Sequence, residues 1–277
     1  MIGGAAVWMG GRLVDPETAA VSAFDHGLTV GDGVFETLRI YGGTPFALRR
    51  HLDRLARSAA GLGLLLPDRG ELERACAEVV AAGGLAEARL RLTVTGGPGP
   101  LGSPRGPGPS TVLAAVAPLA PVTPAAAVAV APWPRNERGA LAGLKTTSYG
   151  ENVLLLAWAR ERGAEEAIVA DTRGRLCEGT GANVFVVHDG RVRTAPLHTG
   201  CLAGITRELV LEHIAVEEAD LPLDALVTAD EAFLTSSTRE VQPIGRVDGR
   251  ALPAAPGPRT SEAMAAFRDL VAADLDP

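Results

Sequence analysis

The sequence predicts a protein of the α+β class. Runs with alternating apolar residues, typical of strands, occur along the chain with runs whose apolar residues lie three and four apart, typical of helices. These runs do not follow one another in a regular β-α-β order, and no internal repeat is evident. The 33 Gly and 20 Pro residues among 277 divide the chain into many short elements. We therefore do not expect a doubly wound parallel sheet.

Turn signals and residue spacing define the elements of the first half. Gly42-Gly43 between two β-rich runs predicts a hairpin over 34–48. Leu52, Leu55 and Ala59 at helical spacing predict a helix over about 49–63. The other expected elements are a strand over 4–9, a turn at Gly10-Gly11, a helix from Pro67 to about residue 82, a strand over 88–95, a turn-rich loop over 96–110 and a strand over 110–118.

A Pro-containing segment, LAPVTPAA at 119–126, predicts an interdomain linker. We expect an N-terminal domain over 1–118 and a C-terminal domain over 127–277. The elements expected after the linker are a strand in AAVAVAP, a helix over about 149–162, a strand over 165–171, a hairpin over 183–195, a helix over 204–214, a strand over 230–238 and a last helix over about 260–274.

Composition excludes several classes of protein. Apolar residues make up 47% of the chain, enough for a substantial core, and the net charge of −7 argues against a nucleic-acid or anionic-membrane partner. No apolar run reaches the roughly 20 residues that span a bilayer. The first residues lack the positive charge of a signal peptide, so we expect a cytoplasmic protein. Cys76, Cys177 and Cys201 are too far apart for a zinc site or a disulfide framework, and we expect no metal.

Lysine use is unusual. Of the 26 basic residues, only Lys145 is a lysine. Where arginine has replaced lysine so widely, a retained lysine points to a need for a primary amine that can lose its proton. Schiff-base chemistry is the main such need. A chance survivor is the alternative interpretation.

Three further features suit a cofactor that bears a phosphate. Gly204 opens a helix whose first N–H groups could bind an anion, although Thr206 there could simply cap the helix. The hydroxyls of 235–238 could bind phosphate oxygens or stabilise an ordinary turn. Glu178, followed by two glycines nearby, could approach a ligand closely or lie solvated on the surface. With Lys145, these features describe a site for pyridoxal 5'-phosphate (PLP).

At these residues the sequence resembles the class IV (fold type IV) PLP-dependent enzymes. The family includes branched-chain aminotransferases, D-amino-acid aminotransferases and 4-amino-4-deoxychorismate lyases. The resemblance covers nearly the whole chain. It rests on seven blocks in order: FDHGLTVGDGVFETLR (24–39), HLDRL (51–55), GLKTTSY (143–149), EEAIVADTRGRLCEGTGANVFVV (165–187), GCLAGITRE (200–208), ADEAFLTSSTREVQPI (229–244) and PGPRT (256–260).

The resemblance implies a fold and a set of residue roles. The fold would be a small N-terminal α/β domain with a larger, barrel-like C-terminal α/β domain, and the chain would form a homodimer. Lys145 would form the Schiff base and Glu178 would pair with the pyridine nitrogen. The other cofactor-binding residues implied are Arg54, Ile205, Thr206 and Ser237, all at the phosphate, and Tyr149, which could instead only begin a helix.

Within this family the sequence favours aminodeoxychorismate lyase, which releases 4-aminobenzoate and pyruvate in folate synthesis. GDGVFET resembles the lyases, in which a threonine at the position of Thr37 relays protons; a residue of high β-propensity is the plain alternative. In both kinds of enzyme the lysine, here Lys145, would act as general base. Phe35 would contact the substrate, and Arg91 and Arg105 would bind its carboxylates, unless Arg105 is only a solvated surface residue.

The alternative is an aminotransferase acting on branched-chain, other or D-amino acids with a 2-keto acid. Branched-chain aminotransferases usually have Gly where this chain has Thr37. D-amino-acid aminotransferases use an R-x-H carboxylate trap after the strand that ends at Thr95, and this chain has Gly96-Gly97-Pro98 there. An (R)-selective amine transaminase and a cofactor-free binding protein are more distant alternatives.

Overall fold

The computed structural model describes residues 4–277 and divides into two compact units. The first comprises the described residues up to Ala120, Leu144–Tyr149 and Asp274–Pro277; the second comprises Pro121–Gly143 and Gly150–Ala273. A single cut in 119–126 therefore does not describe the division. Leu144–Tyr149, which carries Lys145, groups with the first unit because Thr147 N donates to Gly33 O and Thr146 bridges Val34.

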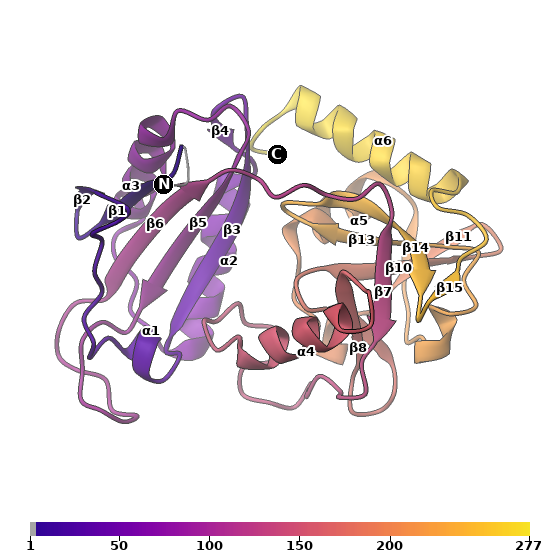
Figure 1. Cartoon of the computed structure of the whole chain (residues 1–277), viewed down its shortest axis with the longest axis horizontal. Helices are drawn as coiled ribbons and strands as arrows, with labels where there is room; N and C mark the ends of the chain where they lie inside the picture. The colour runs from indigo at the N-terminus through magenta and orange to yellow at the C-terminus, as the bar shows by residue number, and fades with distance from the viewer. Residues whose placement is uncertain (1–3) are drawn as a thin grey trace. The chain divides into compact units, whose positions relative to one another are not determined.

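The first unit contains an antiparallel six-stranded sheet in the order β2-β1-β6-β5-β3-β4 (Figure 1). Its strands are β1 (Ala6–Met9), β2 (Arg12–Val14), β3 (Gly33–Tyr41), β4 (Thr44–Pro45), β5 (Ala88–Thr95) and β6 (Thr111–Ala117). The hairpin expected over 34–48 is β3 and β4, although β4 has only two residues.

Two long helices cover one face of this sheet. They are α2 (Leu48–Leu62) and α3 (Arg69–Gly83), close to the ranges that the sequence predicts, and a four-residue helix α1 (His26–Thr29) precedes β3. Alternate residues of β5, such as Leu90 and Leu92, are fully buried in the core beneath the helices. Because strand side chains alternate, Phe35, Thr37 and Arg91 project from the opposite face.

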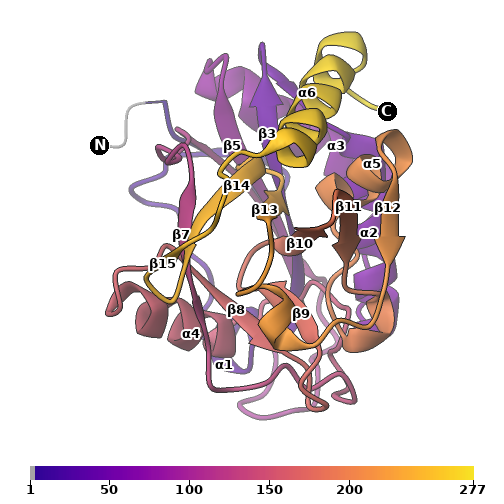
Figure 2. The ribbon, with the colours of Figure 1, turned by 90° about the vertical axis from the view of Figure 1, so that its right-hand side faces the viewer.

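The second unit contains a nine-stranded mixed sheet in the order β12-β11-β10-β13-β14-β7-β8-β9, with β15 beside β14 (Figure 2). The pairs β11/β12, β14/β7 and β7/β8 are parallel, and the others are antiparallel. The strands are β7 (Ala126–Val130), β8 (Glu166–Ala170), β9 (Leu176–Gly179), β10 (Asn183–His188), β11 (Arg191–Thr194), β12 (Val216–Glu218), β13 (Glu231–Ser236), β14 (Glu240–Val247) and β15 (Arg250–Ala251).

This second sheet curls back on itself. β9 ends the strand order, yet only residues 180–182 join it to β10 in the middle of the order, and Gly179 N donates to Ala182 O. The expectation of barrel-like β structure is therefore confirmed. Packed on the sheet are α4 (Gly150–Arg160), α5 (Ile205–His213) and α6 (Pro258–Ala273), with two 3₁₀ turns, η1 (Leu197–Thr199) and η2 (Leu223–Ala225).

A buried carboxylate caps the last helix. Glu231, at the start of β13, accepts hydrogen bonds from Arg259 N (3.1 Å) and Thr260 N (2.8 Å) in the first turn of α6. These N–H groups lack partners within their own helix, so the tertiary contact replaces a local side-chain cap. Within residues 4–277, no helix combines the length and the apolar character that crossing a membrane requires.

Candidate active site

The segment that carries Lys145 is fixed through its backbone. Lys145 N donates to Ser58 Oγ on α2 (3.1 Å), and Lys145 O accepts from Phe35 N on β3 (3.1 Å). The Lys145 Nζ lies 4.5 Å from the centroid of the Phe35 ring and 5.9 Å from that of Tyr149. These two rings meet edge to face, with centroids 5.0 Å apart. The only lysine of the chain therefore presents its amine beside an aromatic pair.

Arg91 lies against the same Phe35 ring. Its guanidinium carbon is 3.7 Å from the ring centroid, and its Nε donates to Thr93 Oγ1 at 3.4 Å. Among residues 4–277, no carboxylate pairs with Arg91. Thr37 is its direct cross-strand neighbour. The structure thus brings together five of the predicted residues (Phe35, Thr37, Arg91, Lys145 and Tyr149) within the first unit.

Arg54 belongs to a buried charged cluster that sequence reasoning did not identify. Its Nε and Nη2 donate to the Glu36 carboxylate at 2.8 and 2.6 Å, and His51 Nδ1 contacts the same carboxylate at 2.7 Å. Burial opposes ionisation of Glu36, but Arg54 and His51 outweigh it and lower its pKa to about 2. Burial lowers the pKa of His51 as well, aided by the charges of Arg54 and Lys145.

A signal for this cluster was present in the sequence. Glu36 lies on the same face of β3 as Val34 and Leu38, which are buried in the core. A carboxylate at such a position needs a partner, and His51 and Arg54, three residues apart on the facing helix, supply it.

The structure pairs Arg105 with a carboxylate of the protein itself. Its Nε and Nη2 donate to the two oxygens of Asp32, both at 2.7 Å, and its other contacts are the carbonyls of Leu62 and Gly63 at the end of α2. The fork of a guanidinium fits a carboxylate in this way, and carbonyls at a helix C-terminus attract positive charge. Arg105 therefore anchors the loop 96–110 to the end of α2, and its contact with a substrate carboxylate stays a prediction.

In the second unit, Glu178 is held at both carboxylate oxygens. Its Oε2 accepts from Leu202 N at 2.9 Å, and its Oε1 lies 3.3 Å from Arg135 Nε. Only 12% of the side chain is exposed. A backbone N–H and a guanidinium therefore flank this nearly buried carboxylate.

The start of α5 directly follows residues 202–204, the segment that contains Leu202. Ile205 and Thr206 are both buried in its first turn, and Gly204 at the N-cap supplies no side-chain cap. Asn183 Nδ2 donates to Leu202 O, and a Cβ at Gly204 would lie 2.1 Å from Asn183 Oδ1, so only glycine fits there. Residues 202–204 consequently fix both Glu178 and the N-terminus of α5.

The hydroxyl cluster 235–238 lies next to Asn183. Thr235 is the cross-strand neighbour of Asn183, and Ser237 lies in the turn that follows β13. The Thr235 Oγ1 is buried and has no hydrogen-bond partner among residues 4–277. An ion pair anchors this turn, which leads from β13 to β14. Arg239 Nη1 lies 3.0 Å from the carboxylate of buried Glu166, which also accepts from Thr180 N at 2.9 Å.

This neighbourhood fits the phosphate of a cofactor. A helix N-terminus without a side-chain cap presents N–H groups to an anion. A buried hydroxyl that lacks a protein partner costs free energy unless a ligand supplies one. Within the second unit, Ile205 and Thr206 meet the first condition and Thr235 meets the second, and Ser237 lies in the turn that follows Thr235.

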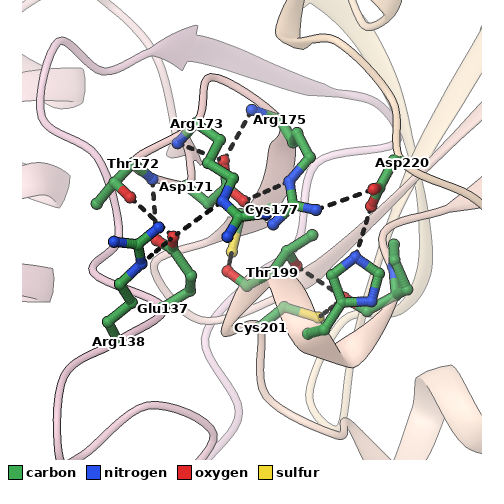
Figure 3. A network of polar contacts seen from close by, with 12 residues as sticks. Glu137, Arg138, Asp171, Thr172, Arg173, Arg175, Cys177, Thr199, Cys201 and Asp220 are labelled. Atoms are coloured by element: carbon green, nitrogen blue, oxygen red, sulfur yellow. Dashed lines mark hydrogen bonds and ion pairs between the residues drawn. The ribbon is translucent and has the colours of Figure 1, made fainter.

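A polar network holds the turn between β8 and β9 (Figure 3). Asp171 accepts from Arg173 N and from Arg175, Arg175 also pairs with Asp220, and Glu137 accepts from Thr172. Cys177 Sγ donates to Thr199 O in the same network. Burial raises the pKa of Cys177, and that of Cys201 to about 11. Both cysteines are therefore buried thiols at neutral pH, not nucleophiles.

Comparison with known proteins identifies the family. The model of the family described as amino-transferase class IV matches residues 33–247. A Methanocaldococcus jannaschii protein provisionally named as a branched-chain-amino-acid aminotransferase is 37% identical over 89% of each chain. A D-alanine aminotransferase of Bacillus licheniformis is 33% identical over 96% of each chain. A branched-chain amino acid aminotransferase of T.th., solved in complex with N-(5'-phosphopyridoxyl)-L-glutamate, aligns at a TM-score of 0.89 with 30% identity, over 97% of this chain and 94% of that one.

The chain belongs to the class IV aminotransferase family. Its fold is that of the fold type IV enzymes, as the sequence resemblance implied, and its cofactor is pyridoxal 5'-phosphate. All three relatives are named as aminotransferases, so they favour the aminotransferase over the lyase that the sequence alone suggested.

Replacing Thr235 by valine separates cofactor binding from stability. Valine has nearly the shape of threonine and removes a buried hydroxyl without a protein partner, so the apo form is expected to be no less stable. PLP is expected to bind about tenfold more weakly, since a hydrogen bond to a charged group contributes roughly 1.5–3 kcal/mol. Equilibrium titration with PLP and thermal melting of the apo form measure the two effects.

The matched control is Thr194→Val. Thr194 is equally buried, but its hydroxyl donates to Val184 O at 2.7 Å. This variant is expected to lose stability and to bind PLP normally. An unchanged PLP affinity in Thr235→Val would remove Thr235 from the phosphate site.

Proposed function

We propose that the protein is an aminotransferase that moves an amino group between an amino acid and a 2-keto acid. The observation that carries the proposal is the arrangement around Phe35. There the only lysine and Arg91, which has no carboxylate partner among the described residues, contact one aromatic ring. One group can exchange a proton with a substrate, and the other can bind its carboxylate. The names of the relatives support transfer rather than elimination.

Each site residue then has a chemical task. When bound, PLP supplies an electron sink for the bond that breaks at the substrate α-carbon. Lys145 holds the cofactor covalently and afterwards moves the proton at that carbon. Glu178 faces the pyridine nitrogen, Arg91 binds the substrate carboxylate, and Phe35 and Tyr149 exclude water around the reacting atoms. The phosphate is bound by Arg54, Ile205, Thr206 and Ser237, with Thr235.

Aminodeoxychorismate lyase is the second candidate, and Thr37 is the reason to retain it. Thr37 lies opposite Arg91 on the face that carries Phe35. A hydroxyl there can relay a proton, as the resemblance of GDGVFET to the lyases implies. A threonine chosen only for its β-propensity would occupy the same position, so Thr37 alone does not outweigh the relatives.

The half-reaction distinguishes the two functions. PLP-loaded protein is mixed with L-leucine, D-alanine, L-glutamate or aminodeoxychorismate, without any keto acid. An aminotransferase is expected to lose its visible absorption band and to release one keto acid per chain, then to turn over continuously once a 2-keto acid is added. Continuous release of 4-aminobenzoate and pyruvate from aminodeoxychorismate, without a keto acid, would instead establish the lyase.

We also propose that the chain forms a homodimer. Phe24, Leu28 and Val30 are exposed apolar residues (Leu28 by 68%), and Gly99 N donates to Phe24 O, which joins the loop 96–110, with its exposed Leu101, to this segment. Exposed apolar patches of this kind mark interaction surfaces. Light scattering is expected to give the mass of two chains for the wild type; the mass of one chain would refute the dimer.

A further inference from the structure

Arg135 connects the first turn of α4 to Glu178 on β9. It follows β7 in the segment that leads toward Lys145, and 15% of its side chain is exposed. Its Nη1 donates to Glu151 and its Nη2 to Asn152 Oδ1 (2.9 Å), both in the first turn of α4. Its Nε lies 3.3 Å from Glu178 Oε1. No block of the sequence resemblance contains Arg135.

The backbone of Arg135 is fixed independently of these contacts. Arg135 N donates to Ala170 O at 2.7 Å, and the residue forms a parallel bridge with Asp171. Asn152, which accepts from Arg135, donates in turn to Thr180 O at 2.9 Å, in the loop that follows Glu178. The orientation of the guanidinium toward Glu178 is therefore set by the backbone contacts of Arg135 and by Asn152, which also binds the loop after Glu178.

The charges of the group are suited to a cationic ligand atom. Glu151 and Glu178 each carry one negative charge and Arg135 carries one positive charge, so the three together have a net charge of −1. A protonated ring nitrogen would bring the total to zero.

We propose that Arg135 is a positioning residue, which holds the Glu178 carboxylate charged and oriented toward the pyridine nitrogen of PLP. This inference rests on the proposed role of Glu178. Leu202 N donates a hydrogen bond to one carboxylate oxygen and Arg135 forms an ion pair with the other, so interactions at both oxygens favour one orientation of the carboxylate. Residues that hydrogen-bond to the ligands of a metal ion have a comparable effect, and their loss weakens metal binding about 10- to 100-fold.

A double-mutant cycle tests the proposal in the PLP-loaded protein. The variants are Arg135→Gln, Glu178→Gln and both together, and the readouts are the dissociation constant of PLP and the visible spectrum of the bound cofactor. Arg135→Gln is expected to weaken PLP binding about tenfold or more and to shift the spectrum in the same direction as Glu178→Gln. In the Glu178→Gln background it is expected to have almost no further effect, because the two residues act as one unit.

Two further variants separate positioning from simple structural loss. Arg135→Lys keeps the charge and is expected to restore part of the affinity. Arg175→Gln is the matched control, since Arg175 is also 15% exposed and pairs with two acids, Asp171 and Asp220, but not with Glu178. It is expected to lower thermal stability and to leave the spectrum of bound PLP unchanged.

The outcomes are separable. If Glu178→Gln changes the spectrum and the affinity but Arg135→Gln changes neither, or if their effects simply add, the role of Arg135 is refuted. If Glu178→Gln itself has no effect, the proposed contact of Glu178 with the cofactor fails first. If the wild type does not bind PLP, the proposed function fails as a whole.

Discussion

Lys145→Arg is expected to abolish turnover while the protein folds normally. Arginine keeps the positive charge but cannot lose its proton at neutral pH or hold PLP covalently. Loss of the general base alone is expected to reduce kcat by about 10²- to 10⁴-fold. The fold should persist because Lys145 contacts Ser58 and Phe35 through its backbone, which the substitution does not change. Steady-state kinetics and thermal melting measure the two properties.

The unusual composition makes a second measurement possible. Borohydride reduction fixes PLP covalently on the amine that holds it, and Lys145 is the only lysine among 277 residues. Peptide mapping of the reduced wild type is expected to find the label on Lys145, and Lys145→Arg is expected to carry none.

Arg39→Lys is the matched control for Lys145→Arg, because Arg39 lies farther along β3 and pairs with Glu87 on the surface. It is expected to keep full activity. Turnover by Lys145→Arg within tenfold of the wild type would contradict the assignment.

Elements with several turns or several alternations could be predicted from the sequence. The helix expected over 49–63 is observed at Leu48–Leu62, and the strand over 88–95 is observed at Ala88–Thr95. β14 was not predicted, because Glu240, Gln242 and Pro243 interrupt its apolar pattern. β9, β12 and β15 have two to four residues each, too few to show a period.

The residues of the candidate site likewise divide into those that could be predicted from the sequence and those that could not. Residues inside sequence blocks, such as Lys145 and Glu178, could be named in advance because several blocks occur in a fixed order. The pairing of Arg105 with Asp32 was not predicted, because the two residues lie 73 positions apart and only the fold brings them together. Arg135 was not named for the same reason, since its contact with Glu178 depends on the pairing of β7 with β8 and of β8 with β9.

Glu36→Gln is expected to cause the largest loss of stability. Glutamine has the size of glutamate but no charge, so Arg54 would be left as a buried cation without its carboxylate. Removing one partner of a buried ion pair costs about 3–5 kcal/mol, a large part of the roughly 5–15 kcal/mol that stabilises a typical domain. Denaturant unfolding at neutral pH measures the loss. The control is Glu87→Gln, which breaks the exposed pair with Arg39 and should cost at most about 1 kcal/mol.

The difference in unfolding free energy between wild type and Glu36→Gln is expected to depend on pH. The pKa of Glu36 is lowered from 4.5 to about 2 in the folded protein, so the unfolded chain binds the proton more readily. The contribution of Glu36 is therefore complete above about pH 4.5 and is lost as the pH falls toward 2. The gap in unfolding free energy between wild type and Glu36→Gln is expected to shrink across that window. A gap that stays constant there would show that the carboxylate charge does not stabilise the fold.

A double variant separates the structural role of the ion pair from cofactor binding. Glu36→Gln with Arg54→Met removes both charges of the buried pair, so no buried cation is left without its carboxylate. We expect this variant to regain most of the stability that Glu36→Gln loses. We also expect it to bind PLP more weakly than the wild type, because the proposed phosphate contact of Arg54 is gone. Wild-type affinity for PLP in a stable double variant would restrict Arg54 to the fold and exclude it from the phosphate site.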